Sequence, residues 1–315
     1  MANPLSKLIS PWYPSNAIGF EKGLLTVVQL ERGKGMSTLK RAATVSLPES
    51  LIGPSFDQPN ISDAAELAAA LRDLATSAGL LQRKRWSVSL PDAASRSLIM
   101  TLESKPASHA ELQEVLTWKV ERGFGVPTEE LSFSRERLPP DAQGRDRYLM
   151  VGTRAAVLAE YENVLALLGW RAGLILPRHV AEGQWLTVNG SREDALLLST
   201  SDTGFTAVVF RCKQPLIIRT VVCAPDECED ELYRLLLFYR DKRAGDGEQA
   251  GSLLSRLLVV GEAMSKERIS SIVRDTLGVD LRPLEADDLG LQLSTRQLSF
   301  DSIAAPAGLA TLSWQ

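Results

Sequence analysis

The chain has 315 residues, of which 44% are hydrophobic and 23% charged, and its formal net charge is −4. That length suits about two domains. The composition is typical of a globular protein rather than a disordered one. The weak negative charge argues against a chain specialised for nucleic acid. The longest apolar runs fall far short of the ~20 residues that span a bilayer, and the N-terminus lacks the apolar stretch of a signal peptide, so we expect a cytoplasmic protein.

The first part of the chain predicts three strands, a helix and a fourth strand. A short strand begins at Ile18, and β-rich runs cover residues 24–30 and 38–47. Apolar residues spaced three and four apart predict a helix over residues 63–78. The alternation of apolar and polar residues over 86–90 predicts a strand with one buried face.

Residues 95–149 do not continue this pattern. They predict a strand over 96–102, a helix over 108–123 and a further strand over 130–138. The helix begins with a capping box, a serine followed three residues later by a glutamate, which satisfies two otherwise unpaired backbone donors. We therefore expect a compact α+β subdomain inserted into the first domain.

The order of elements seen at the start of the chain returns in its second half. Residues 148–188 complete the first domain, with strands predicted over 148–153 and 172–176 and helices over 155–168 and 180–185. The second copy has strands from 196 and over 205–211, 215–222 and 256–260 and a helix over 226–242. It is followed by a helix over 266–277, a strand over 279–284 and a tail of small residues at 304–310. The polar turn cluster at 188–192 is the best domain boundary. We therefore expect a first domain over residues 1–188, which contains the insertion 95–149, and a second domain over 189–315.

Cysteine and histidine usage gives no sign of a disulfide framework or a metal site. The three cysteines, Cys212, Cys223 and Cys228, are odd in number and lack C-x-x-C spacing. The two histidines, His109 and His179, lie far apart with no cysteine cluster beside them. We expect no bound metal, and we interpret both histidines as helix-end or surface residues.

A strand, tight turn, strand, strand, helix and strand thus occur twice, which is the layout of the actin-like ATPase superfamily. The region 87–138, and within it the stretch TWKVERGFGVPTEE at residues 117–130, resembles the PilM family of type IV pilus assembly, with matches at Trp118, Glu121, Pro127, Glu129 and Glu130. The resemblance covers nearly the whole chain. It implies an α/β fold of the FtsA and PilM type, in which duplicated βββαβ units form two mixed-sheet domains and an α+β subdomain is inserted in the first.

The nucleotide motifs of that superfamily are degenerate in this chain. Where the family has a phosphate loop with an aspartate, glycine and serines, the sequence IGFEKGLLTVV is shorter and has no hydroxyl residue before Thr26. The second loop lacks its acid, and a glutamate follows the glycine of the adenosine corner. We expect these positions to form a vestigial nucleotide site: Gly19, Glu21, Lys22, Gly23, Ser199, Ser201, Asp202, Gly204, Gly261 and Glu262.

Since phosphoryl transfer depends almost wholly on placed metal and charge, we expect no catalytic residues and no cofactor, and a protein that is not an enzyme. The alternative is an active protein of the same machinery that binds ATP with Mg through shifted residues. A second alternative is the cytoplasmic actin-like domain of a type II secretion platform protein. That protein continues into a transmembrane segment, whereas this chain ends after its last expected element.

The resemblance implies a cytoplasmic scaffold of the inner-membrane platform, which reaches the membrane only through a partner. That partner is the N-terminal cytoplasmic peptide of a PilN-like membrane protein, with other platform and motor proteins beside it and no nucleic acid. The peptide is expected in a groove between residues 24–47 and the helix 108–123. The residues expected to contact it are Leu25, Val27, Trp118, Glu121, Phe124 and Pro127.

Overall fold

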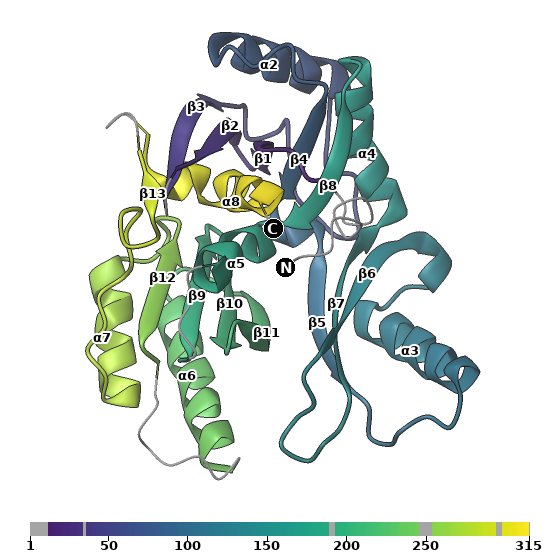
Figure 1. The fold of residues 1–315 in the computed structure, drawn as a ribbon, viewed down its shortest axis with the longest axis vertical. Coiled ribbons are helices and arrows are strands. Elements are labelled where there is room, and N and C mark those ends of the chain that lie inside the picture. Colours follow the sequence, from purple (N-terminus) through teal and green to yellow (C-terminus); the bar gives the residue numbers. More distant parts are fainter. Residues whose placement is uncertain (1–11, 34–35, 189–192, 246–253, 294–297, 315) are drawn as a thin grey trace, which may run out of the picture.

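The computed structural model describes residues 12–33, 36–188, 193–245, 254–293 and 298–314, and its strands form three sheets (Figure 1). The largest sheet has the order β13 (Leu291–Gln292), β3 (Ser37–Ser46), β2 (Leu24–Arg32), β1 (Asn16–Glu21), β4 (Arg85–Leu90) and β8 (Arg171–Pro177). One face of this sheet packs against α2 (Ala64–Ser77) and α4 (Ala155–Leu167). Its other face packs against α8 (Phe300–Thr311).

The second sheet repeats the arrangement of the first. Its order is β11 (Gln214–Val222), β10 (Gly204–Arg211), β9 (Ala195–Ser201) and β12 (Arg256–Val260), with β9 and β12 parallel as β1 and β4 are. One face packs against α6 (Cys228–Gly245) and α7 (Lys266–Leu277), and the other against α5 (Arg178–Val188). The predicted actin-like α/β fold with duplicated βββαβ units is therefore confirmed.

The inserted segment forms a third, smaller sheet with its own helix. Its order is β5 (Arg96–Thr101), β7 (Arg147–Arg154) and β6 (Leu131–Leu138), and all three strands are antiparallel to their neighbours. The helix α3 (His109–Phe124) starts at the predicted serine cap, whose side chain accepts a hydrogen bond from the Glu111 amide. A short 3₁₀ turn, η1 (Asp92–Ala94), precedes this unit, and a second, η2 (Thr128–Glu130), connects α3 to β6 within it.

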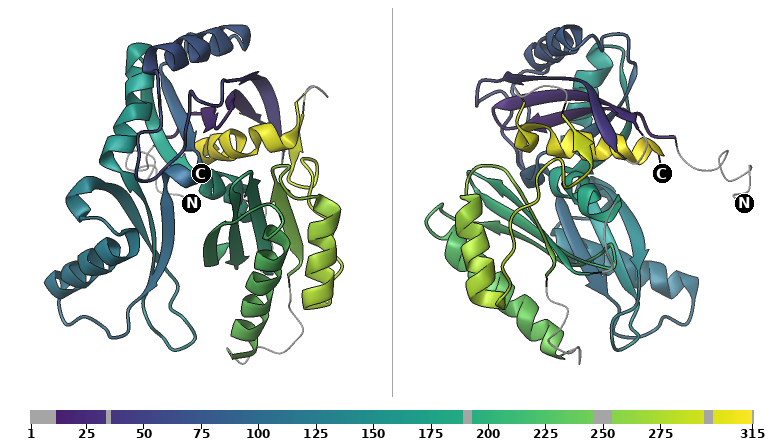
Figure 2. Two further views of the ribbon diagram at one scale, coloured as in Figure 1. Left: turned by 180° about the vertical axis from the view of Figure 1, so that it is seen from behind. Right: turned by 60° about the vertical axis from the view of Figure 1, so that its left-hand side comes forward.

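The end of the chain returns to the first sheet. The predicted strand 279–284 is wrong, because that segment makes only a single bridge between Leu257 and Pro283. The tail of small residues is the helix α8, which runs across the first sheet (Figures 1 and 2). Residues 189–192 of the expected domain boundary lie outside the described part of the chain, so the boundary itself stays a prediction.

Helix α8 contains a proline, and the structure compensates for it. Pro306 has no N–H to donate to the carbonyl of Ser302, four residues earlier. The hydroxyl of Thr26, on β2, donates to that carbonyl at 3.1 Å. The first sheet therefore supplies the hydrogen bond that the helix cannot make for itself.

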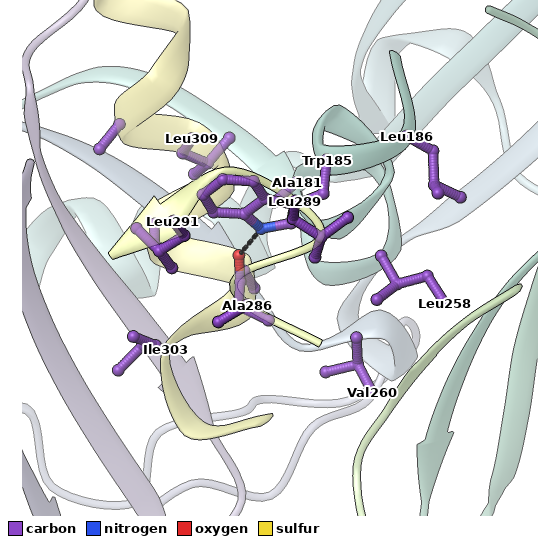
Figure 3. Packing of buried hydrophobic residues seen from close by; sticks show 14 of the residues in the cluster. Ala181, Trp185, Leu186, Leu258, Val260, Ala286, Leu289, Leu291, Ile303 and Leu309 are labelled. Atoms are coloured by element: carbon purple, nitrogen blue, oxygen red, sulfur yellow. Dashed lines mark hydrogen bonds between the residues drawn. The ribbon is translucent and has the colours of Figure 1, made fainter. Parts of the chain in front are cut away.

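Helices α5 and α8 pack against each other between the two large sheets. Trp185 is almost fully buried, and its indole Nε1 donates to the carbonyl of Ala304 at 2.8 Å (Figure 3). The surrounding apolar cluster contains residues of both sheets and both helices. The described part of the chain holds no helix with both the length and the apolarity to cross a membrane.

The close approach of α8 to α5 predicts a specific cost for a small substitution. A methyl group at Gly308 would overlap the backbone carbonyl of Ala181, and backbone cannot move aside as a flexible side chain can. We expect Gly308→Ala to lower the free energy of unfolding by about 1–3 kcal/mol, measured by urea denaturation. Gly53→Ala is the matched control, because nothing lies within 4 Å of a methyl group there. Equal stability of the two variants would contradict this packing.

Candidate functional site

A cleft of about 960 Å³ lies between the two large sheets. Its walls come from the β1–β2 and β9–β10 turns, η1, the start of α5, the β11–α6 connection and the start of α8. Nine of the ten residues of the predicted vestigial nucleotide site line it, and only Gly204 does not. The duplicated fold explains this convergence, since each half contributes its equivalent hairpin, β1–β2 or β9–β10, to the cleft.

Both segments where the sequence resemblance places phosphate loops are tight two-residue turns. Glu21 pairs with Leu24 across the first turn, and Ser201 pairs with Gly204 across the second. Gly23 has a φ of +71°, which such a turn favours. A phosphate-binding loop needs several successive backbone N–H groups arranged in a concave nest. A two-residue turn offers few such groups.

The remaining glycines of the predicted site also have structural roles. Gly261 has a φ of +98°, and a Cβ there would lie 2.5 Å from the Thr200 carbonyl oxygen. A Cβ at Gly19 would lie 3.1 Å from the ring of Pro306 in α8, and one at Gly204 would overlap the neighbouring strand β11. These glycines are therefore explained by backbone conformation and packing without a bound phosphate.

The tips of the two hairpins meet across the cleft. The Lys22 ammonium lies 3.0 Å from the carboxylate of Asp202 and 3.5 Å from that of Glu49. The hydrogen bond and charge of Asp202 raise the pKa of Lys22, with a smaller contribution from Glu49. Because these side chains are exposed, water and salt screen their attraction, and the contact joins the two halves only weakly.

A buried arginine lies at the floor of the cleft between two carboxylates. The Arg178 guanidinium is 3.3 Å from Glu21 through Nη1 and 2.7 Å from Glu182 through Nε. Burial disfavours its charge, but the two carboxylates outweigh this and raise its pKa. Arg178 is therefore a permanent cation that offsets the acids of the cleft floor.

The carboxylates around Arg178 share more negative charge than one guanidinium neutralises. Burial raises the pKa of Glu21 to about 7, with Arg178 opposing and Glu182 and Asp92 adding to the shift. Burial also raises the pKa of Glu182, whose Oε2 has no hydrogen-bond partner. Among the described residues, no group of three or more acidic, histidine or cysteine side chains is arranged to hold a metal ion.

A second buried chain of polar groups links the floor of the cleft to the inserted sheet. His179 Nδ1 lies 2.6 Å from Asp92 Oδ1, and its Nε2 lies 2.8 Å from the Ser97 hydroxyl on β5. The His179 interactions lower the pKa of Asp92 against the opposing effect of burial. A serine, histidine and aspartate in this order also occur in hydrolases. Neither Ser97 nor His179 lines the cleft, so we interpret these three side chains as structural.

His179 is a helix-end residue, the second of α5, but it is not a surface residue, since only 2% of it is exposed. Sequence reasoning also missed Arg178 and Glu182. The signal in the sequence was three polar residues, Arg178, His179 and Glu182, in the otherwise apolar segment 177–183. Arg178 and Glu182 are one helical turn apart. Their partners on β1 and η1 are far away in sequence, so the signal did not identify the contacts.

Three of the six residues expected to contact a partner between β2, β3 and α3 are fully buried. Leu25 and Val27 are fully buried against α2 and α4, because they occupy the core-facing positions of β2. Phe124 is also fully buried, in the core of the inserted subdomain beside Phe56. All three views place α3 far from β2 and β3 (Figures 1 and 2).

The other residues expected to contact a partner differ in their availability. Trp118 is 55% exposed, with the Arg122 guanidinium 5.3 Å from its ring centre. Pro127 is exposed at the turn after α3. Glu121 accepts hydrogen bonds from the amide and the hydroxyl of Thr128, both at 3.2 Å. Glu121 thus already serves to hold the η2 turn against α3.

No protein-family model and no curated protein matches the chain. A chain of the PilM–PilN type IV pilus biogenesis complex matches with a TM-score of 0.73 and 18% identity, covering 97% of this chain and 100% of that one. The cytoplasmic domain of EpsL, an inner-membrane component of the type II secretion system of Vibrio cholerae, matches with a TM-score of 0.49 and 12% identity, covering 95% of this chain and 93% of that one. The first match shows a shared fold along the whole chain, the insertion included.

The raised pKa of Glu21 predicts how stability depends on pH. The folded chain holds this proton up to about pH 7, whereas the unfolded chain loses it near the ordinary value of 4.5. The folded state binds more protons in this window, so the Glu21 contribution makes stability fall as the pH rises from 4.5 to 7. We expect Glu21→Gln to reduce this fall, measured as urea midpoints across a pH series.

Glu49→Gln is the matched control, because Glu49 lines the same cleft with an exposed side chain. Its pH profile should follow that of the unmodified protein. Identical profiles for Glu21→Gln and the unmodified protein would contradict the burial of Glu21 in a site that disfavours its charge.

Proposed function

We propose that the protein is a non-catalytic scaffold that binds a short peptide of a PilN-like membrane protein. The observation that carries this proposal is the shared fold with a chain of the PilM–PilN complex over the whole length of both chains. The match extends through the inserted subdomain, which the duplicated actin-like units do not require. In this proposal the chain works on the cytoplasmic side of the inner membrane, joins the membrane through its partner, and contacts other platform and motor proteins of a type IV pilus.

We also propose that the cleft does not hydrolyse ATP. Its two hairpin turns offer no nest of backbone N–H groups, and its floor already contains the Arg178 cation held by two carboxylates. The rim carries the further carboxylates of Glu49, Asp202 and Glu262. Without a metal ion these charges would repel phosphate groups, and phosphoryl transfer depends on metal ions and cations placed to stabilise phosphate charge.

The competing proposal is an ATP-binding protein of the same fold. One observation favours it: the cleft volume of about 960 Å³ is at the upper end of the roughly 300–1,000 Å³ typical of small-molecule sites. A nucleotide would therefore fit by size. The charge of the cleft and the shape of its turns argue against it.

Calorimetric titration distinguishes these two proposals. We expect no binding of Mg-ATP tighter than about millimolar, which corresponds to about −4 kcal/mol. Lys22→Ala, which removes the contact between the hairpin tips, should not create binding, because the turns remain too short to hold phosphate. Sub-micromolar binding that Glu21→Ala or Asp202→Ala abolishes would establish the ATP-binding alternative.

We place the peptide site on the outer side of the inserted subdomain. Trp118 projects from the face of α3 that does not pack on the sheet, since Leu116, Val120 and Phe124 occupy the packed face. Strand β6 is the last strand of its sheet, so among the described residues one of its edges has no strand partner, and residues 132–137 are exposed. A free edge offers backbone hydrogen bonds to an extended peptide, and an exposed tryptophan offers an apolar anchor.

Truncation of the tryptophan tests this placement. Interface energy concentrates in a few aromatic or arginine anchors, each of which costs ~2 kcal/mol or more when replaced by alanine. We therefore expect Trp118→Ala to weaken binding of a synthetic PilN-like N-terminal peptide at least about 30-fold, measured by fluorescence anisotropy.

Leu167→Ala on α4 is the matched control, because that side chain is also apolar and 55% exposed. It should leave the affinity unchanged, and both variants should keep the melting temperature of the parent. If the Trp118→Ala variant binds the peptide as tightly as the parent does, this surface is not the peptide site.

A further inference from the structure

Two cysteine side chains face each other beside the cleft. Cys223 directly follows β11 and Cys228 is the first residue of α6, and their sulfur atoms are 3.0 Å apart. The amide of Cys223 donates to the Thr203 carbonyl at 3.2 Å, which ties this segment to the β9–β10 turn. Both ends of the Cys223–Cys228 segment are thus held by ordered elements, with the sulfurs already adjacent.

The geometry is close to that of a disulfide although both thiols are reduced. A disulfide bond brings its sulfur atoms to about 2.05 Å, so the two sulfurs need to approach each other by only about 1 Å. The loop between them contains Ala224 and Pro225, which are followed by the turn that starts α6. A shift of that size can be taken up by side-chain rotation and a small movement of this short loop.

The two thiols differ in access. Cys228 is buried, and its thiol contacts the Ala224 carbonyl at 3.4 Å. Burial, with a further contribution from Cys223, raises the pKa of Cys228 to about 12. Cys223 is partly exposed and lines a second hollow of about 440 Å³ between β11 and α6. A small disulfide can therefore reach Cys223 first.

We propose that Cys223 and Cys228 are a redox-modification site, in which a low-molecular-weight disulfide converts the dithiol into an intramolecular disulfide. The Cys223 thiolate attacks one sulfur of the small disulfide, forms a mixed disulfide and releases the first small thiolate. The Cys228 thiol then loses its proton and attacks the Cys223 sulfur, which releases the second small thiol. The protein loses two hydrogen atoms and the small disulfide is reduced to two thiols.

This modification would act on the wall of the cleft. Cys228 and Pro225 line the cleft, and Cys223 lines the neighbouring hollow. The new bond would join the end of β11 to the start of α6 and fix the connection between them. Transient disulfides of this kind in reducing compartments are typically regulatory rather than structural.

The test exposes the purified full chain to glutathione disulfide, followed by denaturing alkylation with N-ethylmaleimide and mass spectrometry. We expect a species that has lost two hydrogen atoms and takes up one label, on the exposed Cys212. Untreated protein should take up three labels. Reduction with dithiothreitol should restore the three-label pattern.

Three variants show whether the new disulfide joins Cys223 to Cys228 or involves Cys212. Cys212→Ser should oxidise as the parent does, whereas Cys228→Ser should stop at a mixed disulfide of glutathione with Cys223. Cys223→Ser should form no intramolecular disulfide. Three labels on the treated parent, or a disulfide that Cys212→Ser abolishes, would overturn the proposal. Both readouts are independent of peptide and nucleotide binding, so they do not depend on the proposed scaffold function.

Discussion

The packing of α8 against α5 is the contact on which the rest of the structure depends. Gly308 lets α8 approach the backbone of Ala181, and Trp185 spans the two helices with its hydrogen bond to the Ala304 carbonyl (Figure 3). The apolar cluster around this crossing includes strands of both large sheets. The two halves of the molecule therefore share one core, and the cleft between them has a floor fixed by that core.

This shared core also determines the chemistry of the cleft. Because α5 begins at the cleft floor, its first residue, Arg178, lies between Glu21 of the first sheet and Glu182 of its own helix. The proposal that the cleft does not use a nucleoside triphosphate rests on this charge-paired arginine and on the two-residue turns. The peptide site that we propose lies elsewhere, on the inserted subdomain, where Trp118 is exposed and one edge of β6 has no strand partner among the described residues. The proposed scaffold role rests on this separation of the peptide site from the cleft.

The sequence was sufficient to predict the elements and their duplication, but not the contacts between distant segments. Strand alternation and helical periodicity report which face of an element is buried, and α2 and α3 follow those patterns closely. The prediction of one buried face was wrong for β4, whose residues 86–90 are buried on both faces because α8 also packs against it. The same alternation buries Leu25 and Val27, which excludes them as partner residues. The sequence did not predict helix α8, because the segment contains a proline and many small residues. The hydrogen bond that compensates for the proline is donated by Thr26 to Ser302, 276 positions away in the sequence. The sequence also did not predict the Glu21–Arg178 ion pair, because its two residues are 157 positions apart.

Hydrogen exchange measured with and without a PilN-like N-terminal peptide tests the central claim most directly. Backbone amides on an unpaired strand edge exchange quickly and slow when they gain a partner. If the chain is a peptide-binding scaffold with an inactive cleft, saturating peptide slows exchange in α3 and β6 and leaves the two hairpin turns unchanged, and Mg-ATP slows neither region. Slowing by Mg-ATP at residues 21–24 and 201–204, with α3 and β6 unaffected by the peptide, would contradict the account.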